Sequence, residues 1–210
     1  MVDDGSSDET PEIVASFATH GVRLIRLRQN RGKGAALRAG VAATEGELVL
    51  LSDADLSTPI EEINRLEEGL AEADLVLGSR ALSESRITVR QPLRRELAGK
   101  LFNFVIRTLG VCDVRDTQCG FKLLRGEVAR RLFAELTIDG FAFDVELVWL
   151  AQRRGYRLLE VGVEWRNDPS SRVRVVRDGL RMMVDVTGLR LRGRSEGRRA
   201  GHGAEGGASG

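Results

Sequence analysis

Short apolar runs alternate along the first half of the chain with segments whose apolar residues recur every three or four positions. The runs predict buried strands and the periodic segments predict amphipathic helices. The predicted strands cover residues 22–27, 47–53 and 74–80, and the predicted helices cover 10–20, 32–43 and 59–71. This alternation is typical of an α/β fold with a mostly parallel central sheet flanked by helices.

The second half of the chain has a different rhythm. Its periodic pattern predicts helices over 93–109, from 127 onward, over 144–154 and around Leu180, and a strand over 157–166, with a turn-rich segment at 113–124. From residue 192 the sequence RGRSEGRRAGHGAEGGASG has no apolar face to bury, and we expect disorder. The pattern therefore predicts one domain over 1–191 and a tail over 192–210.

Composition excludes several classes of protein. The formal net charge of the 210 residues is +1, so nothing in the composition favours binding to nucleic acid. No run approaches the roughly 18 apolar residues of a membrane span. Cys112 and Cys119 fit neither a disulfide framework nor a metal cluster, which indicates a reducing, cytoplasmic setting. Lysine occurs only at 33, 100 and 122, so each lysine stands out against the arginines.

The segment LVLLSDADLSTP carries the strongest chemical signal. An apolar strand ends at Asp53 and Asp55, where open α/β sheets place their ligands. Two carboxylates separated by one residue can share Mg²⁺ or Mn²⁺ with a diphosphate, because these cations prefer hard oxygen ligands. The alternative is that Asp55 or Ser57 caps the helix that opens at Pro59.

Two glycine-containing loops accompany this motif. In NRGKGAALRAG, Lys33 lies between two glycines at a predicted helix start, which suits an anionic ligand, although Gly32 and Gly34 could serve only close packing. The spacing is not that of a P-loop. In VDDGSSDET, Asp4 could accept hydrogen bonds from a base or ribose, and the alternative is an Asx turn with a helix cap.

In this order and spacing, the three stretches resemble family 2 glycosyltransferases with the nucleotide-sugar-binding GT-A fold. Downstream segments are similar to those of dolichyl- or polyprenyl-phosphate β-glucosyltransferases. These segments are GSRALSES, RQPLRRELAGKLFNFVIRTLG, DTQCGFKLLR, IDGFAFDVELVWLAQRRGY and EVGVEWRNDPSSRVRVVRDGLRM. The resemblance runs from Val2 to about residue 190.

The resemblance implies inverting transfer of a hexose from a nucleotide sugar to a polyprenyl (dolichyl-type) phosphate. Residues 56–59, Leu-Ser-Thr-Pro, depart from the related mannosyl enzymes and favour glucose from UDP-glucose. A GDP-mannose-dependent mannosyltransferase remains the alternative. Another is an inactive remnant, because in the family a strand and a helix precede the position of Met1. We expect the coding sequence to continue upstream and supply them.

The resemblance also implies roles for individual residues. It places Asp4 at the nucleoside, Lys33 near the donor, and Asp53 and Asp55 at the metal and diphosphate, where Asp55 contributes to catalysis. Asp144 would be the catalytic base or would position the acceptor; alternatively, it caps the helix over 144–154. The donor and acceptor phosphates would be bound by the following arginines: Arg80, Arg94, Arg95 and Arg172.

Other polar and aromatic residues have simpler interpretations. Asp116 is a weaker candidate for the base than Asp144 and is interpreted as a turn residue, and Trp149 and Trp165 are interpreted as core or rim aromatics. The arginine-rich segment 172–192, with apolar residues such as Leu180 and Val184, could lie on an anionic membrane surface or pack against the sheet. The resemblance thus predicts peripheral contact with the inner face of the cell membrane.

Overall fold

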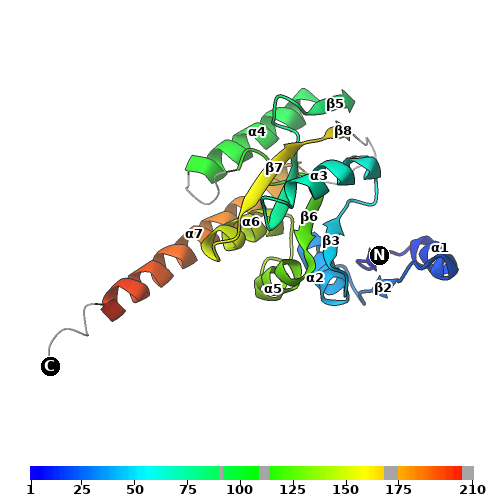
Figure 1. Ribbon diagram of the computed structural model, residues 1–210, viewed down its shortest axis with the longest axis horizontal. Helices are drawn as coiled ribbons and strands as arrows, with labels where there is room; N and C mark the ends of the chain where they lie inside the picture. The colour runs from blue at the N-terminus through cyan, green and yellow to red at the C-terminus, as the bar shows by residue number, and fades with distance from the viewer. Residues whose placement is uncertain (90–91, 109–113, 168–174, 205–210) are drawn as a thin grey trace.

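The computed structural model describes residues 1–89, 92–108, 114–167 and 175–204 (Figure 1). The strands are β1 Val2–Asp3, β2 Ile25–Arg26, β3 Leu48–Leu51, β4 Leu75–Ser79, β5 Arg86–Val89, β6 Lys122–Arg125, β7 Leu158–Gly162 and β8 Glu164–Arg166. The helices are α1 Thr10–Ser16, α2 Lys33–Ala42, α3 Ile63–Gly69, α4 Leu93–Thr108, α5 Gly126–Glu135, α6 Phe143–Arg153 and α7 Val175–Ala204, with short 3₁₀ turns η1 Ala18–His20 and η2 Ile60–Glu62.

The central sheet has four strands in the order β3-β6-β4-β7. Strands β4 and β7 are parallel, whereas β6 lies between β3 and β4 and is antiparallel to both. The sheet is therefore mixed: β3, β4 and β7 run in the same direction, in agreement with a mostly parallel sheet, and β6, which was not predicted, runs in the opposite direction. The reason is that the chain returns from α4 and inserts a reversed strand between two parallel ones.

Side-chain alternation along the strands assigns residues to two cores. Leu75 and Leu77 of β4 pack on one face of the sheet and Val76 packs on the other, as the period of two along a strand requires. All three are completely buried. The predicted strand over 74–80 is confirmed, because its nearly continuous apolar run is what burial on both faces demands.

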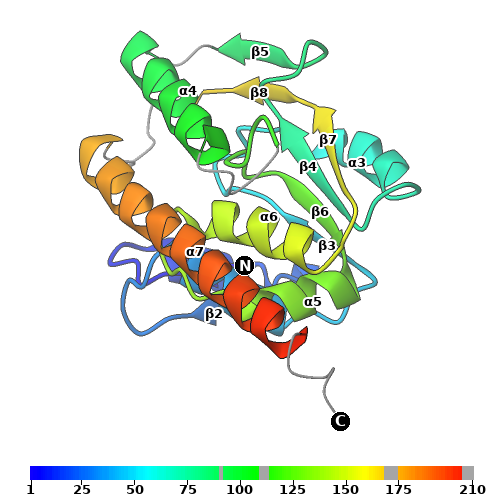
Figure 2. The same ribbon diagram turned by 90° about the vertical axis from the view of Figure 1, so that its left-hand side faces the viewer.

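Helices cover both faces of the sheet. Helix α3 packs over β4, β6 and β7 on one side, and α5 packs on β3 and β6 on the other. Helix α6 lies between the sheet and α7, and α4 runs beside α7 (Figure 2). Met182, Val186 and Leu189 form the buried stripe of α7, so packing against the protein accounts for one face of this helix.

The predicted strand over 157–166 is two strands with different partners. Strand β7 pairs with β4, and β8 pairs with β5 in a separate two-stranded sheet. Val163 joins them, donating its N–H to the carbonyl of Ser79 and accepting a hydrogen bond from Arg86 N–H. Strand β5 was not predicted: its alternating pattern is only four residues long, and all four residues are exposed.

The two ends of the chain differ from expectation. The strand predicted over 22–27 is reduced to β2, which pairs in parallel with β1. Helix α7 continues to Ala204, so the predicted disordered tail is helical over 192–204. Extending an existing helix has no nucleation cost, although the four glycines at 193, 197, 201 and 203 each lower the helix propensity of this segment.

Candidate functional site

The candidate site lies at one edge of the central sheet. Asp53 follows the carboxyl end of β3 and Arg80 follows that of β4. Because β6 is antiparallel to both, its amino end lies at the same edge and brings Gly120 there. Trp165 arrives from β8, which continues from β7 beyond the same end of β4. The reversed strand thus completes the site.

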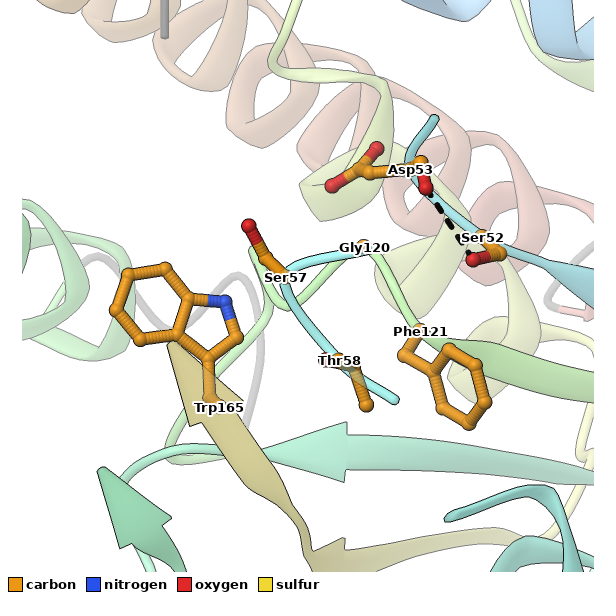
Figure 3. Close-up of a pocket in the computed structure, with 7 residues that line it drawn as sticks. All are labelled: Ser52, Asp53, Ser57, Thr58, Gly120, Phe121 and Trp165. Carbon is orange, nitrogen blue, oxygen red and sulfur yellow. Dashed lines mark hydrogen bonds between the residues drawn. The ribbon is translucent and has the colours of Figure 1, made fainter. Parts of the chain in front are cut away.

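These segments enclose a small polar cavity. Its volume is about 10 Å³, which is room for a single water molecule. Figure 3 shows the residues that line it: Ser52, Asp53, Ser57, Thr58, Gly120, Phe121 and Trp165. Trp165 is therefore a wall residue of this cavity, which is more specific than the core or rim position that the sequence suggested.

Gly120 lies directly against the Asp53 carboxylate. A Cβ atom at position 120 would stand 2.0 Å from Asp53 Oδ2 and 2.5 Å from its Cγ. Any larger residue would push the carboxylate away. The glycine therefore permits the close approach of the β6 flank to the end of β3.

The loop that carries Asp53 and Asp55 is a tight turn. Asp53 accepts a hydrogen bond from Leu56 N–H through its carbonyl, at 3.1 Å. Asp55 Oδ1 accepts one from Ser57 N–H at 2.9 Å, so this carboxylate forms an Asx turn rather than a helix cap. Leu56 has φ of 50°, a left-handed conformation that costs a non-glycine residue energy. Such strain is common where a loop is shaped for a ligand.

Lys33 pairs with Asp53. Its Nζ lies 2.6 Å from Asp53 Oδ1, and the two side chains are 26% and 40% exposed. Burial opposes the charge on Lys33, but the carboxylates of Asp144 and Asp53 outweigh it and raise its pKa. The sequence prediction that Lys33 and Asp53 belong to one site agrees with this contact.

Asp144 lies in the interior, where it meets a second lysine. It is 3% exposed, and Lys122 Nζ lies 2.5 Å from its Oδ1. Burial raises the pKa of the Asp144 carboxyl, and the charges of Lys122 and Lys33 only partly offset this effect. Helix α6 begins at Phe143 with Ala142 as its N-cap, so the capping interpretation of Asp144 was wrong.

The start of α2 is not open to an anion in the way the sequence suggested. The N–H groups of Gly34 and Ala35 donate to the carbonyl oxygen of Asp139, at 2.8 and 3.2 Å. Gly32 has φ of 105°, and a Cβ there would lie 2.5 Å from the same oxygen. Close packing explains both glycines, Gly32 against Asp139 and Gly34 against Ile138 and Phe143, and anion binding at this helix start would have to rely on Lys33.

Asp4 holds the loop before α2. Its two carboxylate oxygens accept hydrogen bonds from Arg31 N–H and Gly32 N–H at 2.8 and 2.7 Å. Each oxygen retains a further lone pair for a ligand. Asp4 also borders a second polar cavity of about 220 Å³, lined by Asp4, Gly5, Ser6, Ser7, Asp8 and Asn30.

Arg80 belongs to a charged and aromatic cluster. Its Nε and Nη2 atoms lie 2.7 and 2.8 Å from the carboxylate oxygens of Asp116, and the guanidinium carbon lies 5.3 Å from the Trp165 ring. Burial opposes ionisation of Asp116, but Arg80 outweighs burial and lowers its pKa. Asp116 is therefore a buried counter-ion and not a simple turn residue.

Sequence reasoning missed the roles of two glutamates. Glu146, 2% exposed, accepts hydrogen bonds from Thr137 N–H and Ile138 N–H and so shapes the loop that caps α2. Glu160 accepts hydrogen bonds from the N–H groups of Arg115 and Asp116. The available signal for Glu146 was a second acid in the apolar run FDVELVWL.

Three further arginines were predicted to bind phosphate. The side chains of Arg94 and Arg95, and the whole of Arg172, lie outside the part of the chain that the structure describes. Within that part, no three His, Cys, Asp or Glu side chains gather into a metal-binding group. Asp53 and Asp55 present carboxylate oxygens on one short loop. This pair suits Mg²⁺ or Mn²⁺ when phosphate and water supply the remaining ligands.

Comparison with known proteins identifies the family. The model for "Glycosyl transferase family 2" matches residues 1–133, more than half of the 210 residues. The chain belongs to glycosyl transferase family 2. The matched region contains Asp4, Lys33, Asp53, Asp55 and Arg80, and it ends before Asp144.

Curated relatives in this family extend over more of the chain. The dolichyl-phosphate beta-glucosyltransferase of Mus musculus is 37% identical over 203 residues, covering 91% of this chain and 63% of the relative. The protein of the same name from Dictyostelium discoideum is 35% identical over 202 residues, covering 91% and 62%. The chain thus spans a little over three fifths of the length of these relatives.

Solved structures agree on the fold. Glucosyl-3-phosphoglycerate synthase from Mycobacterium tuberculosis in complex with UDP has a TM-score of 0.61 at 23% identity, covering 90% of this chain and 66% of that one. Its complex with Mn²⁺ and UDP-glucose has a TM-score of 0.58 at 21% identity, covering 89% and 67%. The family 2 chain therefore has a GT-A-like α/β fold.

Proposed function

We propose that this family 2 chain transfers glucose from UDP-glucose to a polyprenyl (dolichyl-type) phosphate, with inversion at the anomeric carbon. The supporting observation is the presentation of Asp53 and Asp55 on a tight loop beside Lys33, at the edge where β3 and β4 end. The name of the relatives, dolichyl-phosphate beta-glucosyltransferase, supports both the sugar and the acceptor.

Asp53 and Asp55 are the residues that we propose hold Mg²⁺ or Mn²⁺ together with the donor diphosphate. The cation, when bound, would offset the negative charge that grows on the departing nucleoside diphosphate. Crystals of the similar synthase contain Mn²⁺ with UDP-glucose, which supports this choice of cofactor. Lys33 lies where its ammonium group can add a second positive charge for the diphosphate.

Asp4 is proposed as a nucleoside contact. It borders the polar cavity of about 220 Å³ at the end of β1. Its hydrogen bonds to Arg31 N–H and Gly32 N–H fix the loop that leads to Lys33. The nucleoside cavity and the diphosphate site are thus joined by four consecutive residues, 30–33.

The proposed acceptor reduces the need for a general base. A phosphate monoester has its second pKa near 6, so one of its oxygens is already largely anionic at neutral pH and can attack the anomeric carbon directly. The carbon–oxygen bond to the diphosphate breaks as the new bond forms. We therefore propose that Asp144, buried and paired with Lys122, has a positioning role beneath the donor site. The base role implied by the resemblance remains a prediction.

We propose that Arg80 stabilises the donor site indirectly, through its contact with Trp165. Its Nε and Nη2 atoms are engaged by Asp116, and Trp165 lies against the guanidinium group. Because Trp165 also lines the cavity beside Asp53, the position of Arg80 controls one wall of the site. Arg94, Arg95 and Arg172 remain proposed ligands of the acceptor phosphate.

A lipid acceptor requires the site to approach a membrane. Within the part of the chain that the structure describes, no helix has both the length and the hydropathy needed to cross a bilayer. Helix α4 instead carries an exposed apolar stripe at successive helical turns, formed by Leu93, Leu97, Leu101 and Phe104. On the neighbouring α7, Leu180, Val184 and Leu191 are also exposed. We propose that these helices lie on a membrane surface.

The test is a transfer assay with the purified 210-residue chain, Mn²⁺, a polyprenyl phosphate in detergent, and radiolabelled UDP-glucose or GDP-mannose. We expect label in the lipid fraction with UDP-glucose, and none for Asp53→Asn. Preferential transfer from GDP-mannose would show that the donor sugar is mannose and not glucose. No transfer from either donor would favour the inactive remnant.

A further inference from the structure

Lys33 occupies a position from which its ammonium group neutralises Asp53. The Nζ atom lies 2.6 Å from Asp53 Oδ1. The backbone at Lys33 is held on both sides, because Gly32 N–H donates to Asp4 and Gly34 N–H donates to Asp139. Movement of the ammonium group therefore has to come from rotation of the lysine side chain.

A second carboxylate, Asp144, lies on the interior side of Lys33. Lys33 Nζ is 5.9 Å from the ring centroid of Phe143, the neighbour of Asp144 in the chain, and Asp144 is anchored by its contact with Lys122. Lys122 and Asp144 have side chains 1% and 4% exposed, whereas Lys33 and Asp53 are 26% and 40% exposed. The inner pair is thus fixed by packing, and the outer pair is the one that can rearrange.

We propose that Lys33 is a built-in competitor for the cation at Asp53, and that it leaves Asp53 for the donor diphosphate when the metal and the nucleotide sugar bind together. This inference rests on the proposed metal site at Asp53 and Asp55. A divalent cation arriving alone must displace the ammonium group from Asp53 without bringing it a new anionic partner. When a diphosphate arrives with the cation, the displaced ammonium group gains phosphate oxygens, which suit it as a point charge.

The arrangement makes metal binding and nucleotide binding mutually dependent. Because coupling between two binding equilibria is reciprocal, the metal strengthens nucleotide binding by the same factor as the nucleotide strengthens metal binding. The charges at the site explain why each ligand strengthens, and does not weaken, binding of the other. Asp53, Asp55 and Asp144 carry three negative charges and Lys33 and Lys122 offset two of them before the cation enters, so a divalent cation alone leaves one positive charge uncompensated.

The test is direct Mn²⁺ binding, measured from the spin-resonance signal of free Mn²⁺ during titration, with and without UDP. Lys33→Met removes the competing charge and should bind Mn²⁺ about tenfold more tightly than the wild type when UDP is absent. UDP should strengthen Mn²⁺ binding to the wild type but much less to the variant. Lys33→Arg keeps the charge and should behave like the wild type.

Arg31→Met is the matched control, since it removes one positive charge from the same loop, where the arginine pairs with Asp139 and not with Asp53. It should change Mn²⁺ affinity by less than about twofold. Lys33→Gln replaces the methionine variant if the latter does not fold. A folded Lys33 variant whose Mn²⁺ affinity without UDP equals or falls below that of the wild type overturns the proposal.

The failure of the metal site itself has a different signature. Asp53→Asn should abolish Mn²⁺ binding with and without UDP. If Asp53→Asn binds Mn²⁺ as the wild type does, both the metal site and the competition at Asp53 are refuted. If Asp53→Asn loses Mn²⁺ but Lys33→Met gains no affinity, only the competition is refuted and the metal site stands.

Discussion

Arg80 and Asp116 form a bidentate ion pair that also includes the main chain. Arg80 Nε lies 2.7 Å from Asp116 Oδ2, Nη2 lies 2.8 Å from Oδ1, and the backbone N–H of Arg80 donates to Oδ2 at 2.9 Å. Asp116 is 2% exposed. Three hydrogen bonds on one buried carboxylate fix the segment after β4 to the segment before β6, and both segments border the candidate site.

Asp116→Asn should therefore destabilise the protein strongly. The variant leaves the Arg80 charge without its counter-ion, and losing one partner of a buried ion pair typically costs about 3 kcal/mol or more. The free energy of unfolding, from urea denaturation followed by circular dichroism, measures the effect. Glu135→Gln, which breaks the exposed pair with Arg154, should cost no more than about 1 kcal/mol. Equal losses in the two variants would contradict this account.

The same pair predicts how stability depends on pH. The pKa of Asp116 in the folded protein lies below its usual value of 3.8, so the folded state binds the proton less readily than the unfolded state. The stabilisation of the folded state by the ionised Asp116 carboxylate is complete above about pH 4 and is lost as pH falls through the folded-state pKa. Unfolding free energies at pH 7, 4 and 3 should drop more steeply at the acid end for the wild type than for Asp116→Asn. Parallel curves would exclude the prediction.

Gly120→Ala should displace the Asp53 carboxylate. The added methyl group would lie 2.0 Å from Asp53 Oδ2, so the side chain or the loop must move. We expect Mn²⁺ affinity to fall at least about tenfold, as is common when groups that orient a metal ligand are changed. Gly188→Ala on α7, where an added Cβ meets open space, should leave Mn²⁺ affinity unchanged. Unaltered Mn²⁺ binding in Gly120→Ala would argue against Asp53 as a ligand.

The apolar stripe of α4 predicts lipid binding. Leu97 and Leu101 are 65% and 64% exposed, and burying each in a bilayer interface should contribute about 1.5 kcal/mol or more. Leu97→Glu combined with Leu101→Glu should reduce co-sedimentation with vesicles containing anionic lipid by at least about tenfold. Ile13→Glu on α1, where the residue is 55% exposed, serves as the control and should bind as the wild type does. Equal vesicle binding by the double variant and the control would show that the apolar stripe of α4 does not contact the membrane.

Much of the fold could be predicted from hydrophobic patterning. Strands β3 and β4 are confirmed because they are buried and nearly continuous in apolar residues, and helices α4 and α6 because their patterns span several turns. Strand β6 escaped prediction since its four residues, KLLR, follow a segment dominated by turn formers. Its reversed direction depends on where the chain returns after α4, which local patterning does not specify.

The site could be predicted only in part, for a related reason. Asp53 and Lys33 belong to recognisable local motifs, and the structure brings them into contact. Lys122 and Glu146 have no such motif, because their roles arise from partners on other elements. The start of α2 was misjudged since its N–H groups are satisfied by Asp139, more than one hundred residues further along the chain.

The reversed strand also constrains how the protein can form during synthesis. Strands β3 and β4 do not pair with each other; both pair with β6, whose residues are Lys122–Arg125. Until that segment has left the ribosome, the edges of β3 and β4 that will pair with β6 have no partner strand. Closure of the sheet then depends on contacts between residues far apart in sequence, which form slowly. We expect the nascent chain to acquire protease resistance in one late step, after β6 emerges, and to be vulnerable to aggregation before it.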